Sequence, residues 1–161
     1  MTVLELTRTP GDRRLYALEG VGSLRLEGFA SRAATVTSGG SSWRIARSGF
    51  WRRVIEVTDD SRSVVGRFEP RSIRRGGALT WAGRELALRP SASFRERYAL
   101  ADGERELALL DGKGWGKRPV KVNIDDSESV EPGLLLFAAF VVRGLAEDAG
   151  SAAAAGATAA T

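Results

Sequence analysis

The sequence predicts a mainly β fold, a closed antiparallel barrel of about twelve strands around a buried C-terminal hydrophobic helix. The first observation is that apolar residues occupy alternate positions between residues 2 and 124, which is the periodicity of strands that bury one face. The second is that the segment Leu134 to Val142 is apolar without interruption. A helix without a polar stripe has to be surrounded by protein, and a closed barrel of this strand number has room for one along its axis.

The strands are predicted from short runs of alternating apolar and polar residues, at the spacing typical of all-β sandwiches and barrels. The clearest runs contain Leu24/Leu26, Trp43/Ile45, Leu79/Trp81, Leu86/Leu88, Leu107/Leu109 and Val120/Val122/Ile124. Weaker runs are Leu4/Leu6, Leu15 to Leu18, Ala34 to Thr37, Val54 to Val57, Val64 to Phe68 and Phe94 to Leu100.

Pairs of turn-forming residues separate these runs. They are Gly39-Gly40, Asp59-Asp60, Gly76-Gly77, Ala82-Gly83, Asp102-Gly103 and Asp111-Gly112. Two-residue hairpin turns require positive φ angles, which glycine adopts freely and aspartate tolerates. The runs are therefore expected to form a meander of hairpins.

The helix is predicted from residue 132 to about residue 148. An acidic lead-in, Asp125 to Glu131, and the early Pro132 are typical of a helix N-terminus, because the helix dipole attracts anions there and proline has no N–H to lose. The apolar run is about 14 Å long, whereas a membrane core is about 30 Å thick, so the protein is not expected to be an integral membrane protein. The structural core of the helix is expected to contain Leu134, Leu135, Leu136, Phe137, Phe140 and Val141.

The length of 161 residues fits one domain, which is expected to cover residues 1–148. Residues 149–161 are almost entirely Ala, Gly, Ser and Thr, and they are expected to form a disordered tail without a function. The alternative is a continued helix, which Gly150 and Gly156 disfavour.

The composition narrows the possible chemistry. The chain contains no Cys and no His, which excludes disulfides, zinc–thiolate sites and thiol nucleophiles and removes the commonest general base and metal ligand. No catalytic residue, cofactor or metal site is predicted, and the protein is not expected to be an enzyme. Because residues 1–14 have no apolar run, no secretory signal is expected, and a cytoplasmic location is predicted. The dominance of Arg over Lys, with abundant Ala and Gly, indicates a high-GC bacterial genome.

The positive charge is unevenly distributed along the chain. The net charge is +4, and residues 1–80 hold 14 Lys/Arg against 8 Asp/Glu, whereas residues 81–161 hold 10 against 12. A basic face is therefore expected, and a face of this kind favours weak attraction to anionic surfaces without identifying a partner.

Three features together resemble the tubby C-terminal-like superfamily, which includes the tubby proteins, the LURP-one-related proteins and the phospholipid scramblases. They are the strand-rich body, the hairpin Leu79 to Leu86, and the ending Asp125-Asp126 followed by Leu134 to Val142. The resemblance covers most of residues 1–148 and is to the small bacterial members. It implies a twelve-stranded barrel that encloses a C-terminal helix.

The functions within this superfamily differ. Tubby domains bind phosphoinositides through basic surface residues, and scramblases are associated with lipid movement and calcium. No phosphoinositide-binding residue of the family matches a position in this chain. The stretch Asp125 to Glu131 lacks the regularly alternating oxygen ligands of a calcium loop, so calcium binding is not expected.

The segment Gly112 to Lys121 is the most distinctive candidate for ligand binding. Its glycines and cations would let backbone N–H groups and basic side chains contact a phosphate, and Trp115 would offer a stacking or membrane-interface surface. The candidate residues are Lys113, Trp115, Lys117, Arg118 and Lys121. The segment is not a P-loop, because Asp111 and Arg118 occupy positions that require Gly and Ser or Thr. The alternative, which the glycine content favours, is a hairpin with solvated charges.

A second basic group contains two tryptophans, Trp43 and Trp51, among arginines that would suit nucleic acid or an anionic lipid surface. The arginines are Arg44, Arg47, Arg52, Arg53, Arg71, Arg74 and Arg75. The favoured interpretation is that these arginines point outward from strands while Trp43 packs inward, so no nucleic acid partner is expected. Arg143, which interrupts the apolar helix, is expected to emerge at a mouth of the barrel.

The functional prediction is a non-enzymatic binding or scaffold module that contacts anionic lipid headgroups or phosphate groups through basic loops, peripherally at a membrane. The alternative is a protein-interaction or regulatory subunit with a protein partner and no small-molecule ligand. An enzyme that uses carboxylates or Lys is a third hypothesis, for which no residue spacing nominates a pair.

Overall fold

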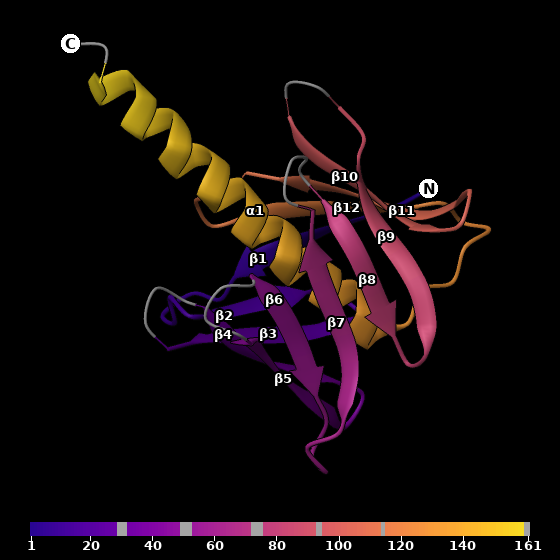
Figure 1. The fold of residues 1–161 in the computed structure, drawn as a ribbon. Coiled ribbons are helices and arrows are strands. Elements are labelled where there is room, and N and C mark those ends of the chain that lie inside the picture. Colours follow the sequence, from indigo (N-terminus) through magenta and orange to yellow (C-terminus); the bar gives the residue numbers. More distant parts are fainter. Residues whose placement is uncertain (29–31, 49–52, 72–75, 93–94, 114, 160–161) are drawn as a thin grey trace.

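The computed structural model describes residues 1–28, 32–48, 53–71, 76–92, 95–113 and 115–159. In these residues twelve antiparallel strands close into a barrel around one helix, α1 (Pro132–Ala159), as the sequence predicts (Figure 1). The strands are β1 (Thr2–Arg8), β2 (Leu15–Leu18), β3 (Gly22–Glu27), β4 (Ala33–Ser38), β5 (Ser41–Ser48), β6 (Val54–Thr58), β7 (Val64–Pro70), β8 (Gly77–Trp81), β9 (Arg84–Pro90), β10 (Glu96–Asp102), β11 (Arg105–Gly112) and β12 (Val120–Ile124).

Each strand pairs with the next strand along the chain, and β1 pairs with β12 to close the ring. The closing register places Leu4 opposite Val122 and Leu6 opposite Val120. Leu6, Val120 and Val122 are fully buried, so the inward apolar positions of the first and last strands meet at the seam. Closure of this kind removes the open strand edges at which sheets pair with other chains.

The inward residues of β11 differ from those predicted. The sequence pattern indicates Leu107 and Leu109, but Leu110 is fully buried opposite Val122 and Leu109 is only partly buried. The cause is a β-bulge in the pairing of β10 with β11, where Leu107 has no partner in the register. A bulge adds one residue to a strand, so the inward phase changes at this position.

The helix α1 fills the barrel, and residues 134–142 are all between 0% and 6% exposed. The six residues named above for the helix core lie within this buried segment. The barrel wall has glycines at positions where the helix approaches it closely. A Cβ atom built on Gly22 would lie 2.9 Å from Leu136 Cδ1, and one built on Gly112 would lie 2.9 Å from Val142 Cγ1.

Gly112 therefore has a different role from the one predicted. The pair Asp111-Gly112 is expected to form a hairpin turn, but both residues are the last of β11, and the turn follows them. Glycine is required here because the helix backbone and Val142 leave no room for a side chain.

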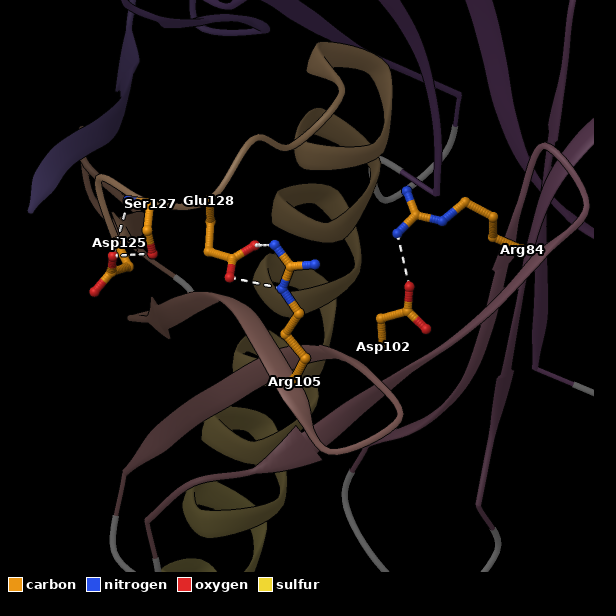
Figure 2. Close-up of polar contacts among 6 residues, drawn as sticks. All are labelled: Arg84, Asp102, Arg105, Asp125, Ser127 and Glu128. Atoms are coloured by element: carbon orange, nitrogen blue, oxygen red, sulfur yellow. Dashed lines mark hydrogen bonds and ion pairs between the residues drawn. The ribbon is translucent and has the colours of Figure 1, made fainter.

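Polar and aromatic contacts hold the start of the helix against the barrel. Trp81 Nε1 donates a hydrogen bond to Glu131 Oε2 at 2.8 Å, and the Trp81 ring lies 6.1 Å from that of Phe137. Arg105 of β11 forms an ion pair of 2.7 Å with Glu128 in the segment before the helix, and Asp125 accepts hydrogen bonds from Ser127 (Figure 2). These contacts fix the path of residues 125–131 and hence the position of the first helical turn.

The prediction of a disordered tail from residue 149 is wrong, because α1 continues to Ala159 and projects beyond the barrel (Figure 1). The part of α1 inside the barrel is already helical, so additional turns do not incur the free-energy cost of forming the first turn. Alanine is also the best helix-forming residue. Gly150 and Gly156 each cost about 1 kcal/mol relative to alanine, which does not stop this propagation. Within the described residues, no helix is long and apolar enough to span a membrane.

Candidate functional site

The meander places successive connections at opposite ends of the barrel. We call the end at which α1 leaves the barrel the mouth; its connections are residues 9–14, 28–32, 49–53, 71–76, 91–95 and 113–119. We call the opposite end, at which α1 enters, the base; its connections are residues 19–21, 39–40, 59–63, 82–83, 103–104 and 125–131. The strands run between these two ends.

Charge is separated between the two ends. The described cations in the mouth connections are Arg13, Arg14, Arg32, Arg53, Arg71, Arg95, Lys113, Lys117 and Arg118. Asp12 is the one acidic residue among the described residues of these connections. The acidic residues of the base connections are Glu19, Asp59, Asp60, Glu104, Asp125, Asp126, Glu128 and Glu131, against the single cationic side chain of Arg62. The molecule is therefore electrically polar along the barrel axis.

The acidic group at the mouth is neutralised. Asp12 forms an ion pair of 2.9 Å with Arg25, and it accepts a hydrogen bond from the backbone N–H of Arg14. The Arg14 N–H first, and Arg25 in addition, hold the pKa of Asp12 below its usual range, so this carboxylate stays ionised and paired. The remaining cations dominate the field at this end.

An open cleft of about 680 Å³ lies at the mouth, between the emerging helix and the barrel wall. We call it the mouth cleft. Its helix side is lined by Phe140, Arg143, Gly144, Ala146, Glu147, Asp148, Gly150, Ser151 and Ala154. Its wall side is lined by Arg32, Arg47, Ile55 and Trp115. Ile55, Phe140 and Ala146 are buried, so the cleft combines an apolar floor with cationic side chains.

Arg47 occupies an inner-face position of β5, and it is exposed at the rim of the barrel. Alternate residues of a strand share one face, so Arg47 shares a face with Trp43 and the fully buried Ile45. Arg47 is paired with Ile55, which is itself paired with the fully buried Phe68. The register thus places Arg47 on the inner face, where the wall extends past the apolar core.

The predicted outward orientation of the arginines is therefore wrong for Arg47. It fits Arg44, which is exposed on the opposite face of the same strand. The two-residue period of a strand, and not the charge of a side chain, determines the face on which a residue lies. Arg52, Arg74, Arg75 and Trp51 lie outside the described residues.

Arg32 lies beside Arg47. The register of β4 with β5 pairs Ala33 with Ala46, and Arg32 precedes Ala33 as Arg47 follows Ala46. Both arginines line the mouth cleft. Among the described residues neither guanidinium has a carboxylate partner, so two unpaired positive charges are adjacent on the inner rim.

Arg143 is the buried charge of the mouth cleft. The residue is 8% exposed, and its Nη2 donates a hydrogen bond of 2.9 Å to Glu147 Oε1. Its Cζ lies 5.8 Å from the centroid of the Tyr16 ring. Its Nε is buried and has no acceptor among the described residues. Arg143 thus emerges near the mouth, but it remains inside the barrel wall.

The predicted ligand-binding residues of the 112–121 segment do not form one cluster. Trp115 is 74% exposed and lines the mouth cleft beside Gly150, while Lys113 and Lys117 are exposed on the connection between β11 and β12. Arg118 forms an ion pair of 3.1 Å with Glu5. Lys121 lies in β12, paired with Glu5 and Asp111, and is exposed on the outer face of the wall.

The other predicted basic residues also separate. Arg53 lies 3.9 Å from Asp148 of the helix, and Arg71 is exposed at the mouth. Trp43 packs against Trp81, with ring centroids 6.0 Å apart, toward the base. Trp43 is therefore part of the packing around the helix start and does not lie among the cations of the mouth.

Comparison with family models, with curated proteins and with solved structures found no match for this chain. The geometry and the charges of the mouth are therefore the basis for the proposed function.

Proposed function

We propose that this protein is a non-enzymatic binding module that contacts anionic lipid headgroups through the cations of the mouth. The observation that carries the proposal is the separation of charge along the barrel axis, with cations at the mouth and carboxylates at the base. A molecule with this polarity is oriented by a negative surface, because the mouth is attracted and the base is repelled.

Two further features support this proposal. Each Lys or Arg near an anionic membrane surface contributes about 1 kcal/mol, so the exposed cations of the mouth connections act together. The exposed Trp115 stands at the same end, and tryptophan favours the boundary between headgroups and acyl chains because its ring is apolar and its N–H is polar. The twelve-stranded barrel around a C-terminal helix supports the proposal that the chain is a tubby-like protein, and phosphoinositide binding by tubby domains is consistent with this function.

The experiment is a vesicle co-sedimentation assay at physiological salt. Vesicles of neutral phosphatidylcholine are compared with vesicles that also contain phosphatidylserine or a phosphoinositide. We expect binding to the anionic vesicles that weakens as salt increases, because exposed charges are screened within about 8 Å at 0.15 M salt. Equal and negligible binding to all vesicles would contradict the proposal.

Two triple variants with the same loss of charge locate the contact. The mouth variant carries Lys113→Gln, Lys117→Gln and Arg71→Gln. The control carries Arg44→Gln, Arg62→Gln and Lys121→Gln, which lie on the outer wall and the base. We expect the mouth variant to lose anionic vesicle binding and the control to retain it. Equal losses would show that only the net charge matters.

A second function, a protein-interaction module, is favoured by the projecting end of α1. Residues 151–157 are exposed on the part of the helix that continues beyond the barrel. A pull-down with the full chain, compared with a chain ending at Asp148, tests this function. A stoichiometric partner that requires residues 149–161 would support it, and the same recovery with both chains would contradict it.

A further inference from the structure

We propose that the mouth cleft binds an amphipathic phosphate monoester, with the phosphate group between Arg32 and Arg47 and the apolar chain against Phe140 and Ile55. The phosphate contact in this site uses Arg32 and Arg47, whereas the variant that tests the membrane contact removes Lys113, Lys117 and Arg71. The two proposals can therefore fail separately.

The first argument is the adjacency of two like charges. Arg32 and Arg47 are neighbours on the inner rim of β4 and β5, and neither has a carboxylate partner among the described residues. Like charges placed opposite each other on neighbouring strands are destabilising. An anion between them removes this repulsion, and guanidinium groups bind phosphate through paired N–H donors.

The second argument is the charge balance of the cleft. Its two acidic residues already have cationic partners, because Glu147 is paired with Arg143 and Asp148 lies 3.9 Å from Arg53. Two positive charges, those of Arg32 and Arg47, remain unmatched among the described lining residues. A phosphate monoester carries close to two negative charges at neutral pH, so its charge matches this pair better than that of a carboxylate.

A buried guanidinium, that of Arg143, lies on the helix side of the cleft. Arg143 is 8% exposed, and its Nε has no acceptor among the described residues. Buried side-chain donors normally have a partner, so an exception needs an explanation. A polar ligand at this wall of the cleft would provide the missing acceptor.

The fourth argument is the apolar surface of the same cleft. Ile55 and Phe140 are buried residues of its floor, and Ala146 and Trp115 also line it. The volume of about 680 Å³ lies within the range of small-molecule sites. Inorganic phosphate alone would leave this apolar surface unused, which is why an attached apolar chain is inferred.

The test is a titration of the full chain with n-octyl phosphate below its micelle concentration, followed by calorimetry and by tryptophan fluorescence. Inorganic phosphate, n-octanol and octanoate serve as comparison probes. We expect saturable 1:1 binding of n-octyl phosphate, at least about tenfold tighter than that of each other probe, because charge-assisted hydrogen bonds and apolar contact both contribute. Absence of saturable binding, or equal binding of octanol or octanoate, would overturn the proposal.

Variants on one strand provide a matched control. Arg47→Met removes a guanidinium from the inner-face positions of β5, whereas Arg44→Met removes one from the outer face, and both residues are exposed. We expect Arg47→Met and Arg32→Met to weaken n-octyl phosphate binding by about tenfold or more, and Arg44→Met to leave it unchanged. Equal affinities for all three variants would contradict the site. Far-UV circular dichroism and thermal melting establish that each variant is folded, and Arg47→Lys is used if Arg47→Met does not fold.

Two further measurements place the ligand in the cleft and separate this proposal from the membrane contact. Trp115→Phe should abolish the ligand-induced fluorescence change, because Trp115 lines the cleft. The variant with Lys113→Gln, Lys117→Gln and Arg71→Gln should retain n-octyl phosphate binding even where it loses vesicle binding. Loss of both activities in that variant would contradict a separate cleft site.

Discussion

The indole N–H of Trp81 donates a hydrogen bond of 2.8 Å to Glu131, so the end of β8 is joined to the residue that precedes helix α1. Trp81 is buried, and its ring contacts both Trp43 and Phe137. A single side chain therefore joins the barrel wall, the base and the first turns of the central helix. This contact fixes where the helix enters the barrel.

Glu131→Ala should destabilise the protein by about 1–3 kcal/mol, because it leaves the buried indole N–H without its acceptor. The measurement is equilibrium unfolding in urea, with Trp fluorescence and circular dichroism as separate probes. Glu104→Ala is the matched control, because its side chain is at the same end and is 102% exposed. The prediction fails if both variants unfold at the same urea concentration.

Phe137→Asp should prevent folding, because it places a carboxylate in the fully buried centre of the helix without a partner. The expected result is an insoluble chain or one without a cooperative thermal transition. Ala153→Asp, on the exposed projecting part of the same helix, should stay folded. A folded Phe137→Asp variant would show that the helix is not part of the core.

The fold could be predicted because its two determinants are local in the sequence. Alternation such as Trp43 and Ile45 identifies strands, and an unbroken apolar segment of nine positions identifies a helix that needs a cover on every side. The end of the helix could not be predicted in the same way. The part of α1 inside the barrel provides the first helical turns. The low helix propensity of Gly150 therefore does not end the helix, because adding a turn to an existing helix costs less than starting one.

The chain ending at Asp148 should keep the folded barrel, because the buried apolar segment ends before that residue. We expect a smaller helical signal in far-UV circular dichroism and a thermal midpoint within a few degrees of that of the full chain. Failure of the shortened chain to fold would show that residues 149–159 stabilise the core. This result would contradict the description of the projecting end as an extension.

Gly112→Ala and Gly144→Ala should have opposite effects. The new Cβ at position 112 would lie 2.9 Å from Val142 Cγ1 and 3.0 Å from Ala146, so overpacking should destabilise the protein by about 1–3 kcal/mol. Gly144 lies within α1, and apart from its own helical turn no atom of the described residues lies within 4 Å of a Cβ built there. Alanine should therefore stabilise the protein by about 0.5–1 kcal/mol. Urea unfolding measures both values, and equal signs would contradict the close approach of the helix at Gly112.

The candidate site was only partly readable from the sequence. The face of Arg47 follows from its position two residues after Ile45. Once the meander order is known, the sequence also shows that cations outnumber acidic residues in the mouth connections and that acidic residues outnumber cations in the base connections as a group. It could not be predicted that Arg32 and Arg143 line one cleft, because residues far apart in the chain meet there only through the barrel closure and the position of the helix. The composition of the 112–121 segment predicts a ligand-binding cluster, but its basic residues do not lie together in the structure.

Low pH should weaken the contacts that Asp125 and Asp126 make at the base of the barrel. The hydroxyl and backbone N–H of Ser127 hold the pKa of Asp125 below its usual range, and the N-terminal ammonium group and Thr2 do the same for the pKa of Asp126. A carboxyl group whose pKa is lower in the folded state stabilises the fold above its unfolded pKa, and this stabilisation is lost as the pH falls through the folded value. The thermal midpoint should therefore decrease below about pH 4.

Asp125→Asn should make this decrease shallower, since the amide oxygen can still accept the hydrogen bonds from Ser127 but does not titrate. Thermal melts between pH 2 and pH 6 measure the effect, and the variant should be less stable than the parent at pH 6 and approach it at pH 2. Asp60→Asn, an exposed substitution on another base connection, is the control for the loss of one negative charge. If both variants change the pH dependence equally, the effect comes from overall charge, and the hydrogen bonds at Asp125 do not couple proton binding to folding.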